Sequence, residues 1–282
     1  IMIGRSLGQL YYKGARNLLT NGKLVDTRNG DTLELIDQKM VLTNPTYLGI
    51  SDPSRMFKKQ YAIAELLWYV GRDRAVGNMG ELASIWNDIK DEHGQVESNY
   101  GTYIFGEQWE WVVNELNMDP ESRRAVIAIY ANGHKYSNEK DHPCTTSIQF
   151  LIRDEYIHLI WNMRSSDLIF GFCNDMWCAG MILQLMFNEL NHPNGEMDLR
   201  LGNITFNLGS FHVYERHFKM IMKAKKFWGN PDKVRGENLI LHKDVTQQSL
   251  RLDSRAINSS HSLEAISQKV SYFDDKCIKG FR

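Results

Sequence analysis

Cysteine and proline are scarce in this sequence, and long apolar runs are missing. The four cysteines among 282 residues show neither paired CxxC spacing nor the density of a small secreted disulfide scaffold, so we expect reduced thiols in a cytosol. No apolar run approaches the roughly 20 residues that span a bilayer, and the first residues, IMIGRSLGQLYY, lack a basic-then-apolar signal. The sequence therefore predicts a cytoplasmic protein that does not enter a membrane.

An excess of positive charge is also missing. Lysine and arginine number 33 against 34 for aspartate and glutamate, so no global basic field exists to hold a nucleic-acid polymer. There is neither a Ser/Gly-rich linker nor an internal repeat, and the 43% apolar content is enough for a large core. We predict one domain over residues 1–282, in which the more polar residues 229–282 pack in a way that we do not predict.

Hydrophobic periodicity predicts a mixed α+β chain. Helical spacing covers residues 57–70, 181–190, a segment through 215–227 and one near 263–275. Apolar or alternating patterns predict strands over 123–131, over 147–165 as a pair joined around 153–155, and over 203–214. A turn over 191–195 follows the second helix. In the first helix, Glu65 stands among apolar neighbours.

Several side chains have the chemistry of a nucleotide site. Cys144 lies in HPCTT between a turn-forming proline and a strand, where a thiolate can meet a ligand, although a lone cysteine is more often a buried structural thiol. His212 and Tyr214 share one face of an extended segment, so both can bind a sugar hydroxyl. Arginine makes bidentate contacts to phosphate, and the candidates, each by itself more often a surface charge, are Arg28, Arg123, Arg124 and Arg164.

Several short motifs are spread along the chain. They are ELLWYV (65–70), SIWND (84–88), SRR (122–124), HPC (142–144), NMRSSD (162–167) with a later Gly171, and LGSFHVY (208–214). Together they resemble the thymidylate synthase superfamily over residues 20–227. The segments NYG (99–101), FGFCND (170–175) and GSFHVYERHF (209–218) make the resemblance closest to the phage deoxycytidylate hydroxymethylases. The resemblance implies a thymidylate synthase-like α+β fold, with a large mixed β-sheet flanked by helices and dimerisation through the sheet.

The resemblance assigns the polar candidates to a pyrimidine deoxynucleoside monophosphate. Arg164 and Ser165 match the residues that hold the nucleotide phosphate. His212 and Tyr214 match the pair that binds the sugar 3′-hydroxyl. In the family the two SRR arginines come from the neighbouring subunit, which implies a homodimer with shared active sites.

Asp175 stands eight residues after Asp167, where the thymidylate synthases of the family carry Asn. An Asn amide donates to uracil O4 and accepts from N3–H, whereas an ionised carboxylate only accepts. Cytosine fits the carboxylate, because its 4-amino group donates and its N3 becomes a donor once a nucleophile adds at C6. Such a site can discriminate by a factor of roughly 10⁴. The alternatives are a protonated Asp175, or an inward-turned Asn174 that binds uracil.

The resemblance also implies a mechanism. Cys144 adds to pyrimidine C6, so that C5 attacks the one-carbon unit of the expected co-substrate, 5,10-methylenetetrahydrofolate. Water then adds where thymidylate synthases transfer a hydride, which gives a 5-hydroxymethyl product and tetrahydrofolate. Glu65 is expected to move protons and activate the water, and Tyr100 to order solvent beside the cysteine. No metal is expected, and the residues assigned to the folate are Trp86, Asp167 and Gly171.

Other functions stay open. The nearest are hydroxymethylation of dUMP or of ribose CMP and thymidylate synthesis itself, although Thr145 and Met163 replace the His and Gln usual in thymidylate synthases. A catalytically silent member would only bind nucleotide or a partner protein, which the retained catalytic residues disfavour. A cysteine hydrolase with His142 or His212 as its base lacks the glycine loop of an oxyanion hole. If the gene is a phage gene, the enzyme works in the host cytoplasm.

Overall fold

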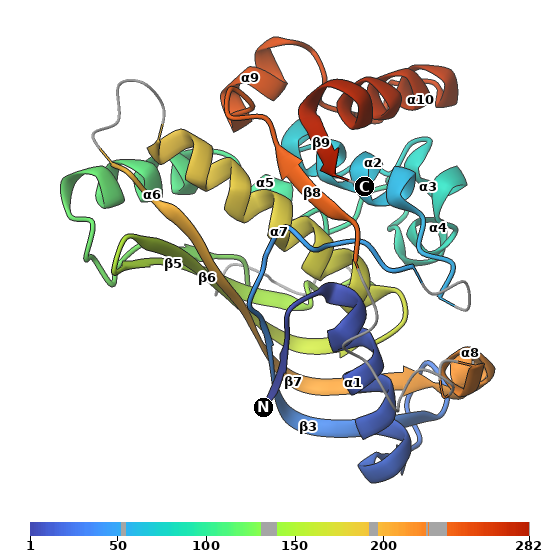
Figure 1. The fold of residues 1–282 in the computed structure, drawn as a ribbon. Helices are drawn as coiled ribbons and strands as arrows, with labels where there is room; N and C mark the ends of the chain where they lie inside the picture. The colour runs from blue at the N-terminus through green and yellow to red at the C-terminus, as the bar shows by residue number, and fades with distance from the viewer. Residues whose placement is uncertain (52–54, 131–139, 192–196, 224, 226–235, 282) are drawn as a thin grey trace.

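The computed structural model describes residues 1–51, 55–130, 140–191, 197–223, 225 and 236–281 (Figure 1). Within them, seven strands form one sheet in the order β1-β3-β7-β6-β5-β4, with β2 also paired to β3. The strands are β1 Met2–Gly4, β2 Lys23–Val25, β3 Thr32–Leu42, β4 Val126–Ala128, β5 Thr145–Arg153, β6 Tyr156–Asp167 and β7 Arg200–Tyr214. The β1–β3 and β6–β7 pairs are parallel and the others antiparallel, so the sheet is mixed, as predicted.

Two strand predictions have different outcomes. The pair joined around residues 153–155 is confirmed, because β5 and β6 form an antiparallel hairpin whose turn residues Asp154 and Glu155 have φ of 50° and 65°. Positive φ at both positions is the backbone of a type I′ turn, which suits the twist of the strands. The strand predicted over 123–131 is shorter than expected, because only β4 (Val126–Ala128) forms. The amide of Arg124 donates to Ser122 Oγ instead of to a neighbouring strand. Residue 131 lies outside the described residues.

The helices are longer or shorter than their patterns indicated. The helix predicted over 57–70 is confirmed by α2 (Lys59–Gly71), and the helix predicted over 181–190 is the second half of α7 (Gly171–Leu190). The helix predicted over 215–227 is a 3₁₀ turn (Glu215–His217) followed by α8 (Phe218–Lys223). Residues 224, 226 and 227 are not described. Nearly every side of α7 is buried, so its first half has no amphipathic period. Of the turn predicted over 191–195, Asn191 is a turn residue and residues 192–195 are not described. The helices are α1 Leu7–Asn21, α2 Lys59–Gly71, α3 Met79–Leu82, α4 Ile85–Ile89, α5 Gly101–Ile104, α6 Glu107–Met118, α7 Gly171–Leu190, α8 Phe218–Lys223, α9 Gln247–Leu252 and α10 Leu263–Tyr272.

Helices cover one face of the sheet. α7 packs on β6 and β7, and α1 packs on β3 and α7; in Figure 1, α7 separates the sheet from α2. Figure 1 shows none of the described helices over the opposite face. There, Asn207 Nδ2 donates to Asn162 Oδ1 at 2.8 Å, and Asn162 Nδ2 donates to Ser147 Oγ at 3.0 Å. Dimerisation through the sheet would cover this face and stays a prediction.

The C-terminal residues 236–281 bind α7 through two amide side chains. Gln184 Nε2 donates to the carbonyl of Leu239 at 3.1 Å, and Gln184 Oε1 accepts from the amide of Leu241 at 2.8 Å. Asn188 Nδ2 donates to two further carbonyls of this segment at 3.0 and 2.8 Å. In this segment β8 (Asn238–Leu241) pairs antiparallel with β9 (Ile278–Phe281), and α9 and α10 lie between them in the chain. α10 confirms the helix predicted near 263–275 and is followed by a π turn (Phe273–Cys277).

The parallel pairing of β6 and β7 aligns two of the sequence motifs. Ser165 pairs with Ser210, and Asp167 pairs with His212. On the other side of β7, Glu34 of β3 pairs with the same histidine. RSSD and GSFHVY therefore lie beside each other at one end of the sheet. Among the described helices, none is long and apolar enough to cross a membrane.

Candidate active site

Four of the predicted substrate-binding residues line one pocket of about 250 Å³. They are Arg28, Ser165, His212 and Tyr214, and the pocket is completed by Thr27, Asn29, Thr32, Glu34 and Ser210. Three distant segments meet here because β3 and β6 flank β7. Guanidinium, imidazole and hydroxyl groups together suit a sugar phosphate.

The imidazole of His212 has a defined hydrogen-bonding role. Ser210 Oγ donates to Glu34, so the same oxygen accepts from His212 Nδ1, which lies 3.2 Å away. Burial lowers the pKa of His212 while Asp167 and Glu34 oppose that shift, which leaves the ring neutral near physiological pH. With its proton on Nδ1, the ring presents Nε2 as an acceptor for a sugar hydroxyl.

Cys144 lies directly before β5, and Arg164 fixes the loop that carries it. The guanidinium of Arg164 donates through Nε to the carbonyl of Pro143 at 3.1 Å and through Nη2 to the carbonyl of His142 at 2.9 Å. The amide of Arg164 donates to the carbonyl of Cys144 at 2.8 Å. The amide of Cys144 donates to Tyr100 Oη at 3.3 Å. The predicted nucleophile, its solvent-ordering tyrosine and the phosphate arginine are therefore adjacent.

The surroundings of Cys144 favour its protonated thiol. Burial raises its pKa to about 11, and the carboxyls of Asp175 and Asp141 add to that shift. Arg164 and the hydroxyl of Tyr100 lower the pKa. Because the thiolate is the reactive form, attack by Cys144 depends on positive charge held close to it.

Glu65 projects from α2 into a cluster of hydroxyl groups. Tyr61 Oη donates to Glu65 Oε1 at 3.2 Å, and Trp86 Nε1 donates to Tyr61 Oη at 2.8 Å. Burial raises the pKa of Glu65 to about 7, and the hydroxyl groups of Tyr61 and Tyr69 oppose the shift. A carboxyl that titrates near neutral pH can both give and take a proton.

Asp175 is coupled electrostatically to both Cys144 and Glu65. Burial raises its pKa well above the usual range, and the charges of Glu65 and Asp167 raise it further. In turn, Asp175 raises the pKa of Cys144 and of Tyr100. These surroundings favour a protonated Asp175, whereas the sequence-based interpretation took the carboxylate as ionised.

Asn174, the neighbour of Asp175, is engaged elsewhere. Arg55 Nη2 donates to Asn174 Oδ1 at 3.4 Å. Arg55 is 2% exposed, and its guanidinium lies over the rings of Phe57 and Phe170, at 5.4 and 5.1 Å from their centroids. Asn174 Oδ1 is therefore already an acceptor for Arg55, whereas the carboxyl of Asp175 is coupled electrostatically to Cys144.

The residues assigned to the folate lie around the start of α7 and the Glu65 cluster. Asp167 Oδ2 accepts from the amide of Phe170 at 2.8 Å, whereas its Oδ1 is buried and has no partner among the described residues. A buried unpaired acceptor is costly, so this oxygen fits a ring N–H of a ligand. A Cβ at Gly171 would lie 3.8 Å from Asp167 Cβ and from Asp175 Oδ2, so the packing of this chain does not require a glycine there. Trp86 is buried and reaches Glu65 through its bond to Tyr61.

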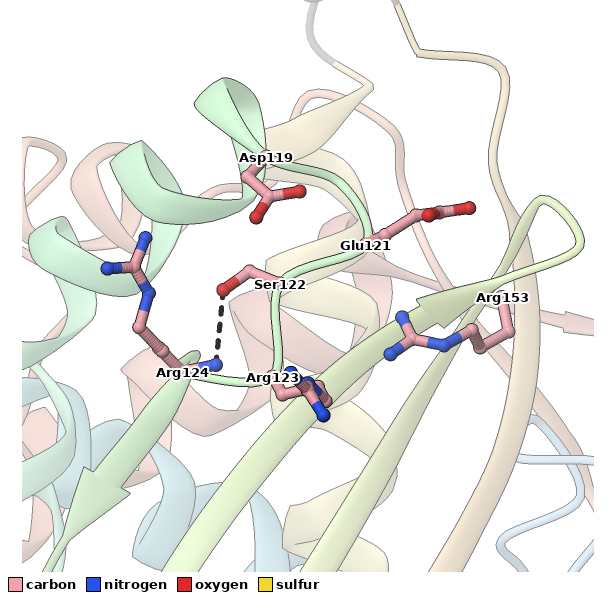
Figure 2. Close-up of a pocket in the computed structure, with 6 residues that line it drawn as sticks. All are labelled: Asp119, Glu121, Ser122, Arg123, Arg124 and Arg153. Carbon is pink, nitrogen blue, oxygen red and sulfur yellow. Dashed lines mark hydrogen bonds between the residues drawn. The ribbon is translucent and has the colours of Figure 1, made fainter.

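Arg123 and Arg124 lie in a different pocket, of about 540 Å³ (Figure 2). Nε and Nη2 of Arg124 both donate to Glu115 Oε1 at 2.8 Å. Figure 2 shows Arg123 beside Arg153 on the same side of the segment, and Arg123 is exposed. A role at the phosphate requires a second copy of the chain and stays a prediction. The pocket is lined by Asp119, Glu121, Ser122, Arg123, Arg124 and Arg153.

Tyr61 and Tyr69 are site residues that the sequence analysis missed. They stand four residues before and after Glu65 in YAIAELLWY, and side chains four apart share one face of a helix. The helical spacing was therefore a usable signal. Arg55 had no such signal, because it reaches Asn174 from a separate segment.

Comparison with protein families shows which family the chain belongs to. The family model described as Thymidylate synthase matches residues 9–244. The chain belongs to the thymidylate synthase family. A solved structure, the thermostable thymidylate synthase A from Bacillus subtilis, has a TM-score of 0.66 and 21% identity, and the match covers 84% of this chain and 89% of that chain. The predicted thymidylate synthase-like fold is thus confirmed.

Among the curated relatives of this chain are proteins of three phages. The deoxycytidylate 5-hydroxymethyltransferase of Enterobacteria phage T2 is 32% identical over 230 residues, which cover 78% of this chain and 88% of the relative. The protein of the same name from Enterobacteria phage T4 is 32% identical over 207 residues, which cover 70% of this chain and 82% of the relative. The expected resemblance to this phage subgroup is confirmed.

Proposed function

We propose that this chain is a deoxycytidylate 5-hydroxymethyltransferase: dCMP, 5,10-methylenetetrahydrofolate and water give 5-hydroxymethyl-dCMP and tetrahydrofolate. The observation that carries the proposal is Asp175, a carboxyl coupled electrostatically to both Cys144 and Glu65. The names of the phage relatives support the same substrate and reaction. Because these relatives come from phages, they also support an enzyme that acts in the cytoplasm of an infected host cell.

Asp175 complements cytosine through one shared proton. A protonated carboxyl has one donor and one acceptor, which match N3 and the 4-amino group of cytosine. When the sulfur of Cys144 adds at C6, N3 becomes basic and takes this proton, so the contact strengthens as charge develops. Uracil already carries a proton on N3, and its O4 accepts a bond only while Asp175 stays protonated. Uracil N3 therefore cannot take the proton that cytosine N3 takes.

Covalent activation begins at Cys144. Its sulfur forms a bond to C6, which makes C5 nucleophilic toward the one-carbon unit supplied by the folate. The C5 proton is then lost, tetrahydrofolate leaves, and an exocyclic methylene remains on the base. Water adds to this methylene, and the C6–S bond breaks to release the product. Arg164, which lowers the pKa of Cys144, favours the thiolate needed for the first step.

Glu65 is the proposed base for the water. Its pKa of about 7 allows it to accept a proton from water at the pH of a cell. Tyr100, bonded to the amide of Cys144, places a further hydroxyl beside the sulfur and orders solvent there. On the folate side, Asp167 Oδ1 is the unpaired acceptor, and Trp86 supplies an apolar ring.

Phosphate binding is proposed to use two subunits. Two N–H groups of Arg164 bind the loop before the cysteine, and an arginine has five, so donors remain for a phosphate beside Ser165. Arg28 lines the same pocket as Ser165. The SRR arginines of a second copy complete the site in a homodimer that pairs through the open face of the sheet.

The second candidate function is hydroxymethylation of dUMP, which a protonated Asp175 admits. The test is incubation with dCMP, dUMP or CMP and methylenetetrahydrofolate, with mass analysis of the nucleotide and absorbance detection of dihydrofolate. We expect a gain of one hydroxymethyl group on dCMP and no dihydrofolate. A methyl gain on dUMP together with dihydrofolate would show a thymidylate synthase instead.

A further inference from the structure

A chain of two hydrogen bonds leads from Trp86 to Glu65. Trp86 Nε1, on α4, donates to Tyr61 Oη at 2.8 Å, and Tyr61 Oη donates to Glu65 Oε1 at 3.2 Å. Tyr61 and Glu65 are four residues apart on α2, so their side chains lie on one face of that helix. Tyr61 is thus the link between the proposed folate side and the proposed base.

The direction of both bonds is fixed by chemistry. An indole N–H only donates, so the oxygen of Tyr61 must accept from Trp86, and its single proton is free to point at Glu65. Burial and the charge of Glu65 raise the pKa of Tyr61 well above its usual range, so this proton stays on the phenol. Tyr61 is therefore a permanent donor to Oε1.

The two oxygens of Glu65 are consequently different. Oε1 accepts from Tyr61, whereas Oε2 is buried and has no hydrogen-bond partner among the described residues. A proton on Oε1 would compete with the proton of Tyr61, so protonation takes place on Oε2. The titratable groups coupled to this carboxyl are Tyr61 and Tyr69 from its own helix and Asp175 and Cys178 from α7.

We propose that Tyr61 is a positioning residue that makes Oε2 of Glu65 the atom that takes the proton from water and keeps Glu65 ionised near neutral pH. The proposal rests on the proposed role of Glu65 as base. It adds the hydroxyl that sets both which oxygen reacts and the pH at which it does so.

The test is the pH dependence of kcat for Tyr61→Phe with dCMP. Loss of a donor to the carboxylate raises the pKa of Glu65, and the base is active above its pKa, so the acid limb of the profile moves to higher pH. A hydrogen bond to a charged group corresponds to a shift of about one pH unit or more. Below the limb the variant is then roughly tenfold slower than the wild type, and at high pH the two rates converge. A loss of kcat by the same factor at every pH would overturn the proposal.

Three variants keep the result interpretable. Tyr272→Phe, on α10, removes a hydroxyl that accepts from Arg255 and leaves the limb unmoved. Glu65→Gln removes the limb together with most turnover. If the limb and the turnover persist in this variant, the proposed role of Glu65 as base is wrong, whatever the result with Tyr61→Phe. A fluorinated tyrosine at position 61 donates more strongly, so it moves the limb to lower pH even if Tyr61→Phe folds poorly. An unmoved limb with the fluorinated residue overturns the proposal.

Discussion

Asp175→Asn is the substitution that bears most directly on the choice of base. The native carboxyl is coupled to Cys144 and Glu65, and its neighbour Asn174 is bonded to Arg55. An Asn at position 175 has a donor for uracil O4 and an acceptor for uracil N3–H, so both polar groups of uracil become paired. The variant also lacks the proton that cytosine N3 takes when C6 is attacked. We therefore expect the preference to move from dCMP toward dUMP.

The size of the change follows from one lost pairing. In Asp175→Asn, the cytosine N3 that becomes basic on attack at C6 has no proton to take, and leaving such a group unpaired costs about 3 kcal/mol. This free energy corresponds to a factor of roughly 100 in the ratio of kcat/KM for dCMP over dUMP. Asp175→Asn should lower the ratio by this factor.

Turnover of dCMP should depend on pH in the wild type. The pKa of Asp175 is raised, so the carboxyl is protonated below that pKa and ionised above it. An ionised carboxyl has no proton for cytosine N3 to take. Turnover of dCMP should therefore fall as the pH rises through the pKa of Asp175, and Asp175→Asn should lack this limb.

The assay is competition between dCMP and dUMP in one reaction, with both products counted by mass spectrometry across the pH range. Asp167→Asn is the control, because it changes a nearby carboxyl on the folate side and should raise KM for the folate without changing the base ratio. An unchanged ratio in Asp175→Asn, or an equal change in Asp167→Asn, would refute base reading by Asp175.

Three further predictions concern the nucleophile, its activation and the C-terminal segment. Cys144→Ser should abolish turnover and keep dCMP binding, measured by calorimetry; normal turnover would exclude covalent attack by this residue. Arg164→Gln should raise the pKa of Cys144 above about 11, because the guanidinium of Arg164 lowers that pKa. The measurement is the pH dependence of alkylation of the Cys144 thiol, which should shift to higher pH. An unchanged alkylation profile counts against activation by Arg164. Gln184→Leu should destabilise the protein by about 2 to 4 kcal/mol, because the buried carbonyl of Leu239 and amide of Leu241 lose their partners. Thermal unfolding measures this loss, with the exposed Gln60→Leu as the control, and equal melting temperatures for the two variants would refute it.

The sequence predicted the parts of the fold that have a clear period or turn. The hairpin of β5 and β6 alternates along both strands and places Asp154 and Glu155 at its turn, and α2 has helical spacing around Glu65. The first half of α7 was not predicted, since a helix buried on all sides shows no polar face. The packing of residues 236–281 was not predictable either, because it depends on Gln184 and Asn188 meeting backbone groups far along the chain.

The candidate site was predicted residue by residue from motifs, and the structure adds the state of each group. Asp175 and Cys144 both have raised pKa values, because burial and neighbouring carboxyls act on them in ways that no local pattern displays. Helical spacing places Tyr61 on the same face as Glu65, but its bond to Trp86 is evident only in the structure. Motifs predict the reacting residues, whereas the protonation state depends on the three-dimensional surroundings.

Turnover of dCMP in water labelled with oxygen-18 tests the addition of water to a Cys144-activated base most directly. We predict that 5-hydroxymethyl-dCMP forms with the label in its new hydroxyl group and that dihydrofolate does not accumulate. A methylated nucleotide formed together with dihydrofolate, or a hydroxymethyl product without the label, would contradict it.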